Sequence, residues 1–130
     1  MSAANLNFLD QRTFLSGIGF TTIVGEEAFK NQKKYVFDAA PDQDLYTQTL
    51  KIVEKQKDPY FLALQTISFH KPFNSPYGDT EEDARRYADK TLYYFYQQLK
   101  KEKFFDNGIL IIVGDHRKMT PLMSGEKEAL

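Results

Sequence analysis

The chain contains no cysteine, no tryptophan and no long run of apolar residues. The absence of cysteine excludes a disulfide framework and a cysteine-ligated zinc ribbon, although it leaves the cellular compartment open. No segment approaches the roughly eighteen apolar residues of a membrane-spanning helix, and residues 1–9 lack the basic and apolar regions of a secretory signal. We therefore expect no transmembrane segment here, so that any anchor or export signal would lie outside this chain.

An excess of charge of one sign is also missing. The 17 Lys and Arg residues are scattered among 18 Asp and Glu residues, which gives a formal net charge of -1. Nucleic-acid-binding proteins concentrate basic residues on one side, so we expect no nucleic-acid partner. The 130 residues, of which 42% are hydrophobic, are enough for one folded domain with a sizeable core.

Three segments carry helix signals. Residues 9–18 predict a short helix that ends at glycines and is followed by an extended stretch over residues 20–24. Pro41 and the acids after it predict the start of a second helix, which ends near residue 55. Thr80 and Asp83 form a possible capping box for a third, long helix. The residues that share one face of this helix are Ala84, Tyr87, Ala88, Thr91, Leu92, Phe95 and Leu99.

Two nearly continuous apolar runs, residues 60–67 and residues 109–113, have the pattern of strands that are covered on both faces. The long helix lies between them, so the three elements predict a βαβ unit with a right-handed crossover. The predicted fold class is therefore α/β. The two strands would run parallel, with their carboxyl ends at the same edge of the sheet.

That edge would bring together the only two histidines of the chain. Ser68 and His70 follow the first run, while Asp115 and His116 follow the second. A carboxylate and an imidazole are good ligands for zinc or manganese, and open α/β sheets bind ligands at strand ends. The alternative is that Asp115 caps a turn and each histidine is solvated or bonded to a backbone carbonyl.

Three other groups of residues have structural interpretations that we favour. Tyr93, Tyr94 and Tyr96 could stack on bases, but their place on the long helix favours packing, or else a partly exposed flank. The lysines at 100–103 suit the C-terminal end of a helix better than a phosphate site. Arg85 and Arg86 have the pattern of a solvated helix face.

Several motifs are specific through their order along the chain. Residues 58–61 read Asp-Pro-Tyr-Phe, residues 66–72 read Thr-Ile-Ser-Phe-His-Lys-Pro, residues 87–89 read Tyr-Ala-Asp, and residues 111–116 read Ile-Ile-Val-Gly-Asp-His. Upstream, residues 19–29 carry a Gly-Phe, Gly, Phe pattern and Asp42 begins an Asp-x-x-Leu-Tyr helix start. Over about residues 8–122 this order resembles the alkaline phosphatase superfamily, in its sulfatase-like branch of phosphoglycerol and phosphoethanolamine transferases, which includes lipoteichoic acid synthases.

The resemblance implies a fold, a site and a reaction. The fold would be a fragment of an α/β/α sandwich with mostly parallel strands. Asp115 and His116 would be ligands of a catalytic divalent metal, zinc or manganese, and His70 would contact the transferred phosphate group or support a second metal. In this family a metal-activated Thr or Ser attacks the phosphodiester, and an alcohol or water resolves the covalent phospho-enzyme.

The chain departs from the complete pattern of the family. The nucleophile and its neighbouring acidic ligand belong to an upstream segment, so no catalytic nucleophile can be assigned here. A later segment with another histidine is missing after Leu122, and Arg117 and Lys118 stand where many relatives carry glycine or tyrosine. We therefore expect residues 1–130 to be a single partial catalytic domain, a C-terminal portion that binds metal weakly and is inactive alone.

The parent protein would act on phosphoglycerol or phosphoethanolamine groups of envelope glycolipids or polymers, at the extracytoplasmic face of a bacterial inner membrane. Its partners would be a phosphate-ester or lipid-headgroup substrate and the rest of the catalytic domain, while the chain itself would be soluble. Two alternatives stay open. One is a sulfatase, whose cysteine nucleophile would also lie upstream, and the other is a non-catalytic binding or regulatory module that keeps this part of the fold.

Overall fold

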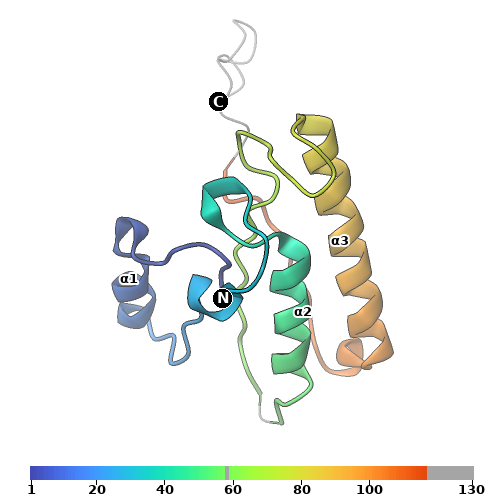
Figure 1. The fold of residues 1–130 in the computed structure, drawn as a ribbon. Coiled ribbons are helices and arrows are strands. Elements are labelled where there is room, and N and C mark those ends of the chain that lie inside the picture. Colours follow the sequence, from blue (N-terminus) through green and yellow to red (C-terminus); the bar gives the residue numbers. More distant parts are fainter. Residues whose placement is uncertain (58, 117–130) are drawn as a thin grey trace, which may run out of the picture.

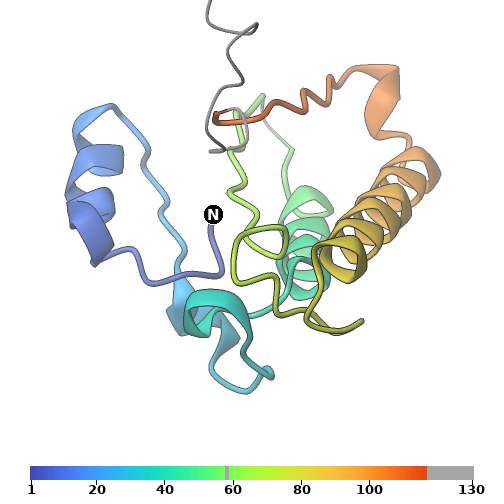
Figure 2. The same cartoon turned by 90° about the horizontal axis from the view of Figure 1, so that it is seen from above.

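The structure is a computed structural model that describes residues 1–57 and 59–116. Its helical segments are the 3-10 helix η1 (Phe8–Asp10), helix α1 (Gln11–Gly17), the 3-10 helices η2 (Glu26–Phe29) and η3 (Val36–Asp38), helix α2 (Asp42–Val53), helix α3 (Glu81–Lys101) and the 3-10 helix η4 (Phe104–Asp106). Helices α2 and α3 lie side by side, and α1 lies on the opposite side of α2 from α3 (Figures 1 and 2).

Helix α3 begins and ends as its sequence predicts. The hydroxyl of Thr80 accepts a hydrogen bond from the backbone N–H of Asp83 at 3.1 Å and donates one to the Asp83 carboxylate at 2.6 Å. Acidic residues fill the first turn, and Lys100 and Lys101 lie in the last turn. The predicted inward face is confirmed at its centre, because Ala84, Tyr87, Thr91, Phe95 and Leu99 are buried.

Helix α2 starts directly after Pro41, which takes the N-cap position in an extended conformation. The ring of Tyr46 stacks on that of Phe95 in α3, with centroids 4.6 Å apart and planes inclined by 13°. Tyr46, Phe95 and Leu99 form one core cluster between the two helices. The partly buried residues packed against it are Leu50, Val53, Leu64, Leu92, Phe104 and Leu110.

A second core cluster joins the N-terminal segment to the start of α2. Its buried residues are Ala3, Phe29, Ala39, Ala40 and Leu45, and Leu64 packs against this cluster as well as the first. The N-terminal residues lie between two other extended segments. The ammonium group of Met1 donates to the carbonyl of Ala63 at 2.7 Å, and the N–H of Ser2 donates to the carbonyl of Val24 at 3.0 Å.

The prediction of two strands is wrong for this structure. Residues 60–67 and 109–113 are extended chain without regular secondary structure (Figure 2). Within residues 1–57 and 59–116 the only β-bridges are the isolated pairs Ser2 with Gln65 and Ser75 with Gly78. A strand forms only beside a neighbouring strand that completes its hydrogen-bond ladder. An apolar sequence does not reveal whether such a neighbour is present. The predicted burial also fails, because Ile109 and Val113 expose 83% and 80% of their surface.

Of the two structural interpretations of the tyrosines, the structure fits the exposed flank and not packing in a core. Tyr93, Tyr94 and Tyr96 lie on the outer side of α3 and are 63%, 45% and 39% exposed. Arg85 and Arg86 are exposed, as predicted for a solvated face. None of the helices that the structure describes is long and apolar enough to cross a membrane.

Candidate functional site

Asp115 and His116 follow the extended segment 109–113, at the end of the residues that the structure describes. The Nε2 atom of His116 lies 3.8 Å from the Oδ2 atom of Asp115, and the backbone N–H of His116 donates to Oδ1 at 2.9 Å. The two side chains are 87% (Asp115) and 51% (His116) exposed, so an ion or a ligand can reach both. The bond from the His116 N–H joins neighbouring residues and holds the Asp115 carboxylate beside the backbone of His116.

The donor chemistry of this pair fits a divalent metal. Zinc binds carboxylate oxygen and imidazole nitrogen at about 2.0–2.2 Å, so two donor atoms lie about 3.4 Å apart in tetrahedral geometry and at most about 4.2 Å apart in any geometry. The separation of 3.8 Å between Nε2 and Oδ2 lies between these two values. Within residues 1–57 and 59–116, however, no three His, Cys, Asp or Glu side chains gather closely enough to hold a metal. The pair therefore supplies two ligands and requires others.

His70 lies in the loop between residue 67 and α3. Its Nδ1 atom is 2.7 Å from the backbone carbonyl oxygen of Lys71, and its ring meets the ring of Phe37 edge-on with centroids 4.7 Å apart. A carbonyl oxygen only accepts hydrogen bonds, so Nδ1 must carry the hydrogen. The opposite atom, Nε2, then accepts a hydrogen bond when the imidazole is neutral and donates one when it is protonated. A contact from Nε2 to a phosphate oxygen accordingly requires the imidazolium.

Phe37 is a neighbour of His70 that sequence reasoning missed. Its ring is exposed, and its backbone has the left-handed conformation with φ of 53° and ψ of 34°. A bulky residue with positive φ is an outlier that the surrounding structure must enforce. No signal in the sequence pairs the two residues, because 33 positions separate them.

A buried carboxylate fixes the start of the His70 loop. The Oδ1 atom of Asp42 accepts hydrogen bonds from the backbone N–H groups of Ile67 at 2.9 Å and Ser68 at 3.2 Å. The N–H of Asp42 in turn donates to the hydroxyl of Ser68 at 2.9 Å. Burial raises the pKa of Asp42, and the two backbone N–H groups oppose that rise. These three bonds tie the first residue of α2 to the chain two residues before His70.

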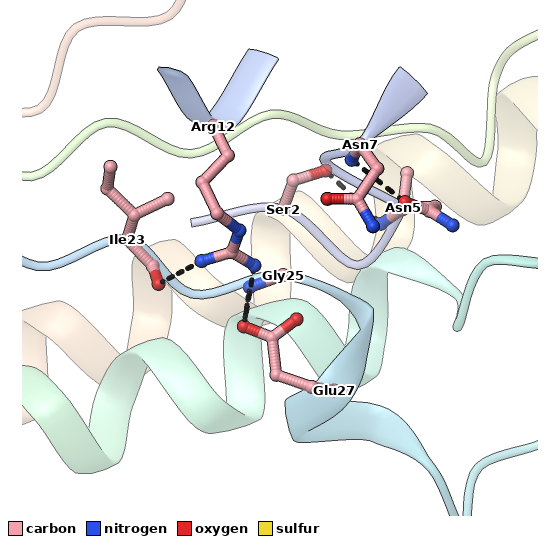
Figure 3. Close-up of polar contacts among 8 residues, drawn as sticks. Ser2, Asn5, Asn7, Arg12, Ile23, Gly25 and Glu27 are labelled. Atoms are coloured by element: carbon pink, nitrogen blue, oxygen red, sulfur yellow. Dashed lines mark hydrogen bonds and ion pairs between the residues drawn. The ribbon is translucent and has the colours of Figure 1, made fainter. Parts of the chain in front are cut away.

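Figure 3 shows a second polar group that the sequence did not reveal, between α1 and the segment 23–27. The guanidinium of Arg12 donates to the carbonyl of Ile23 at 3.3 Å and to the Oε1 atom of Glu27 at 3.0 Å. The N–H of Gly25 donates to the same Oε1 at 3.0 Å. Slight burial pushes the pKa of Glu27 upward, but the bonds from Gly25 and Arg12 outweigh it and leave the pKa lowered. This network holds α1 against the following segment.

The structure thus brings together some of the predicted site residues. Asp115 and His116 are adjacent and share a contact, while His70 lies against Phe37. The sequence predicts that His70, Asp115 and His116 meet at one edge of a sheet. That edge is not formed, because neither residues 60–67 nor residues 109–113 are a strand.

The chain matches the sulfatase family model over residues 1–127. It is 30% identical over 89 residues to lipoteichoic acid synthase 1 of Bacillus subtilis, a match that covers 58% of this chain and 14% of that protein. Lipoteichoic acid synthase 2 of the same organism is 26% identical over 101 residues, covering 67% of this chain and 15% of that protein. The matched segments therefore span about one seventh of the length of these relatives.

A solved structure also resembles this fold. It is a protein of the alkaline phosphatase superfamily from Vibrio parahaemolyticus, with a TM-score of 0.71 and 29% sequence identity. The match covers 82% of this chain and 29% of that protein. This likeness supports the predicted α/β fold class, although the α/β/α sandwich itself is not visible among the residues described here.

Proposed function

The chain belongs to the sulfatase family, and from this premise we propose that it is part of a metal-dependent enzyme that transfers or hydrolyses phosphodiester-linked groups. The similarity to two lipoteichoic acid synthases favours phosphotransfer over sulfate-ester hydrolysis. The substrate groups would be phosphoglycerol or phosphoethanolamine, carried by glycolipids or polymers of the bacterial envelope. The reaction would then take place at the extracytoplasmic face of the inner membrane.

The observation that carries this proposal is the exposed pair of Asp115 and His116, in a chain that matches the family model almost from end to end. A carboxylate oxygen and an imidazole nitrogen 3.8 Å apart can bind one zinc or manganese ion. When bound, such an ion polarises a phosphoryl oxygen and lowers the pKa of an attacking hydroxyl group. Residues 1–130 would supply these two ligands, and the rest of the catalytic domain would supply the nucleophile and the remaining ligands.

His70 would bind the transferred phosphate group. The bond from Nδ1 to the carbonyl of Lys71 fixes the ring plane and directs Nε2 away from that carbonyl. Once protonated, Nε2–H can donate to a phosphate oxygen, and the positive charge strengthens that hydrogen bond. The three bonds between Asp42 and residues 67–68 would keep the loop in place while this happens.

A manganese titration tests the metal site on this chain. We expect paramagnetic broadening of backbone amide NMR signals that is centred on Asp115 and His116. The substitution Asp115→Asn should abolish the localised broadening and change the free energy of unfolding by less than about 0.5 kcal/mol, because the side chain is exposed. The matched control is Asp106→Asn, another exposed carboxylate, which should leave the broadening in place.

Broadening that is spread evenly over acidic residues would contradict the metal site. Cooperative unfolding that is lost in the Asp115→Asn variant would show that the residue is structural instead. In a longer protein that contains this chain, hydrolysis of a sulfate ester without cleavage of a glycerol phosphodiester would replace the phosphotransferase with a sulfatase. A folded protein that binds substrate headgroups without turnover would support the non-catalytic module.

A further inference from the structure

Helix α3 presents an aromatic and cationic surface that the proposed function does not use. Tyr93, Tyr94 and Tyr96 are exposed on its outer side, and so are the lysines at its C-terminal end. The ring of Phe105 lies 5.4 Å from that of Tyr96, and the Nζ atom of Lys100 lies 5.7 Å from the centre of the same ring. We define the α3 face as Tyr93, Tyr94, Tyr96, Lys100, Lys101 and Phe105.

The charges on this part of the chain are unbalanced, although those of the whole chain are not. Residues 85–103 contain six Lys and Arg residues and two acidic residues, whereas the formal net charge of the chain is -1. Arg85 forms an ion pair with Glu82 on the same helix. The other five cations still outnumber Asp89 and Glu102, so an excess of positive charge remains near the exposed rings.

The outer side of α3 is uncovered among the residues that the structure describes. The opposite side of the helix buries Phe95 and Leu99 against α2, and α3 forms one outer flank of the molecule (Figures 1 and 2). Covering the outer side with an apolar protein surface would bury unpaired ammonium groups and the Arg86 guanidinium at high cost. The exposed rings therefore need a partner that also accepts the cations.

We propose that the α3 face docks on an anionic lipid bilayer, with its tyrosines and Phe105 in the headgroup region and its lysines next to the lipid phosphates. Tyrosine suits that position because one end of its side chain is apolar and the other is polar. Long lysine side chains place their charge at the level of the phosphates while their methylene groups contact apolar surface. A soluble polyanion would use the cations alone and leave the four rings exposed, so the rings favour the bilayer.

Vesicle binding tests the proposal without any measurement of catalysis. We expect the chain to co-sediment with vesicles of phosphatidylglycerol and phosphatidylcholine in equal parts, and not with vesicles of pure phosphatidylcholine.

Each cation near an anionic surface contributes about 1 kcal/mol, which is about fivefold in binding. The variant K100Q/K101Q should therefore bind at least about tenfold more weakly, and Y93S/Y96S should lose binding to a similar degree. The matched control K55Q/K57Q removes two exposed lysines after α2 and should bind like the original chain.

A tryptophan reporter locates the contact independently of these losses. Because the chain has no tryptophan, Tyr93→Trp introduces a single emission that should shift to shorter wavelength on the mixed vesicles. Phe14→Trp, at an exposed position of α1, should show no shift. The proposal is overturned if the mixed vesicles do not bind, if K55Q/K57Q weakens binding as much as K100Q/K101Q, or if both reporters shift alike. Binding to polyphosphate without binding to vesicles would identify a soluble polyanion as the partner instead.

Discussion

At Asp42, two physical effects act on one carboxylate in opposite directions. Burial disfavours the ionised form, whereas the N–H groups of Ile67 and Ser68 favour it, and burial prevails so that the pKa is raised. Asp42 nevertheless holds α2 to the loop that carries His70. Its ionisation state therefore links the stability of the chain to the placement of a proposed substrate-binding residue.

This linkage predicts a pH dependence with a definite sign. In the unfolded chain the pKa of Asp42 is about 3.9. In the folded chain the pKa is raised, so the carboxyl group keeps its proton to higher pH. Its stabilising contribution is thus fully present below about pH 4 and is lost as the pH rises through the folded pKa. Asp42→Asn is always neutral, so the unfolding free energy of the original chain minus that of the variant should fall as the pH rises from about 4.

Urea unfolding at a series of pH values measures that difference. Asp106→Asn, which changes an exposed carboxylate, should give no comparable trend. If the original chain instead gained stability over the variant as the pH rose, the hydrogen bonds to Ile67 and Ser68 would outweigh burial.

At the scale of single elements, the cap of α3 offers a second test. Replacing Thr80 with alanine removes the hydroxyl that accepts from Asp83 N–H. Such a change costs about 1 kcal/mol of unfolding free energy. Thr47→Ala is the matched control, because the Thr47 hydroxyl bonds only to the carbonyl of Gln43 within α2, and alanine is a better helix former there. We expect thermal unfolding to show a lower midpoint for Thr80→Ala and no loss for Thr47→Ala.

The same element shows why some of the fold could be predicted and some could not. Helix α3 is encoded locally by Thr80, the first-turn acids and a periodic apolar face, so its start and its buried side follow from the sequence. The strands predicted at 60–67 and 109–113 depend on neighbouring strands, which a pattern within one segment does not describe. The exposure of Tyr93 could not be decided for a related reason, because tyrosine suits both a buried core and a hydrated surface.

Pairings between distant residues account for what was missed at the candidate site. Asp115 and His116 are adjacent in sequence, so their contact could be anticipated. The bonds from Asp42 to Ser68, the contact of Phe37 with His70 and the pairing of Arg12 with Glu27 all join segments that the tertiary fold brings together.

For the whole molecule, Leu64 is the residue that both core clusters share. Leu64→Ala should cost about 2 kcal/mol, at the lower end of the range for leucine because the side chain is only partly buried. Hydrogen exchange should accelerate at the amides near Phe29 in one cluster and near Phe95 in the other. Leu50→Ala is the same leucine-to-alanine change at a residue that packs only against the cluster between α2 and α3. Faster exchange should then be confined to the amides near Phe95. Acceleration around Phe95 alone in both variants would show that Leu64 does not couple the clusters.

The hydrogen bonds of the N-terminal residues have a practical consequence for immobilisation and labelling. The α-ammonium group of Met1 bonds to Ala63, its carbonyl accepts from the N–H of Gln65, and partial burial lowers the pKa of the amine. A fusion partner or an amine-directed dye at that end would alter the hydrogen bond that seats the first residue beside residues 63–65. Immobilisation of this chain for binding experiments should therefore avoid the α-amino group of Met1.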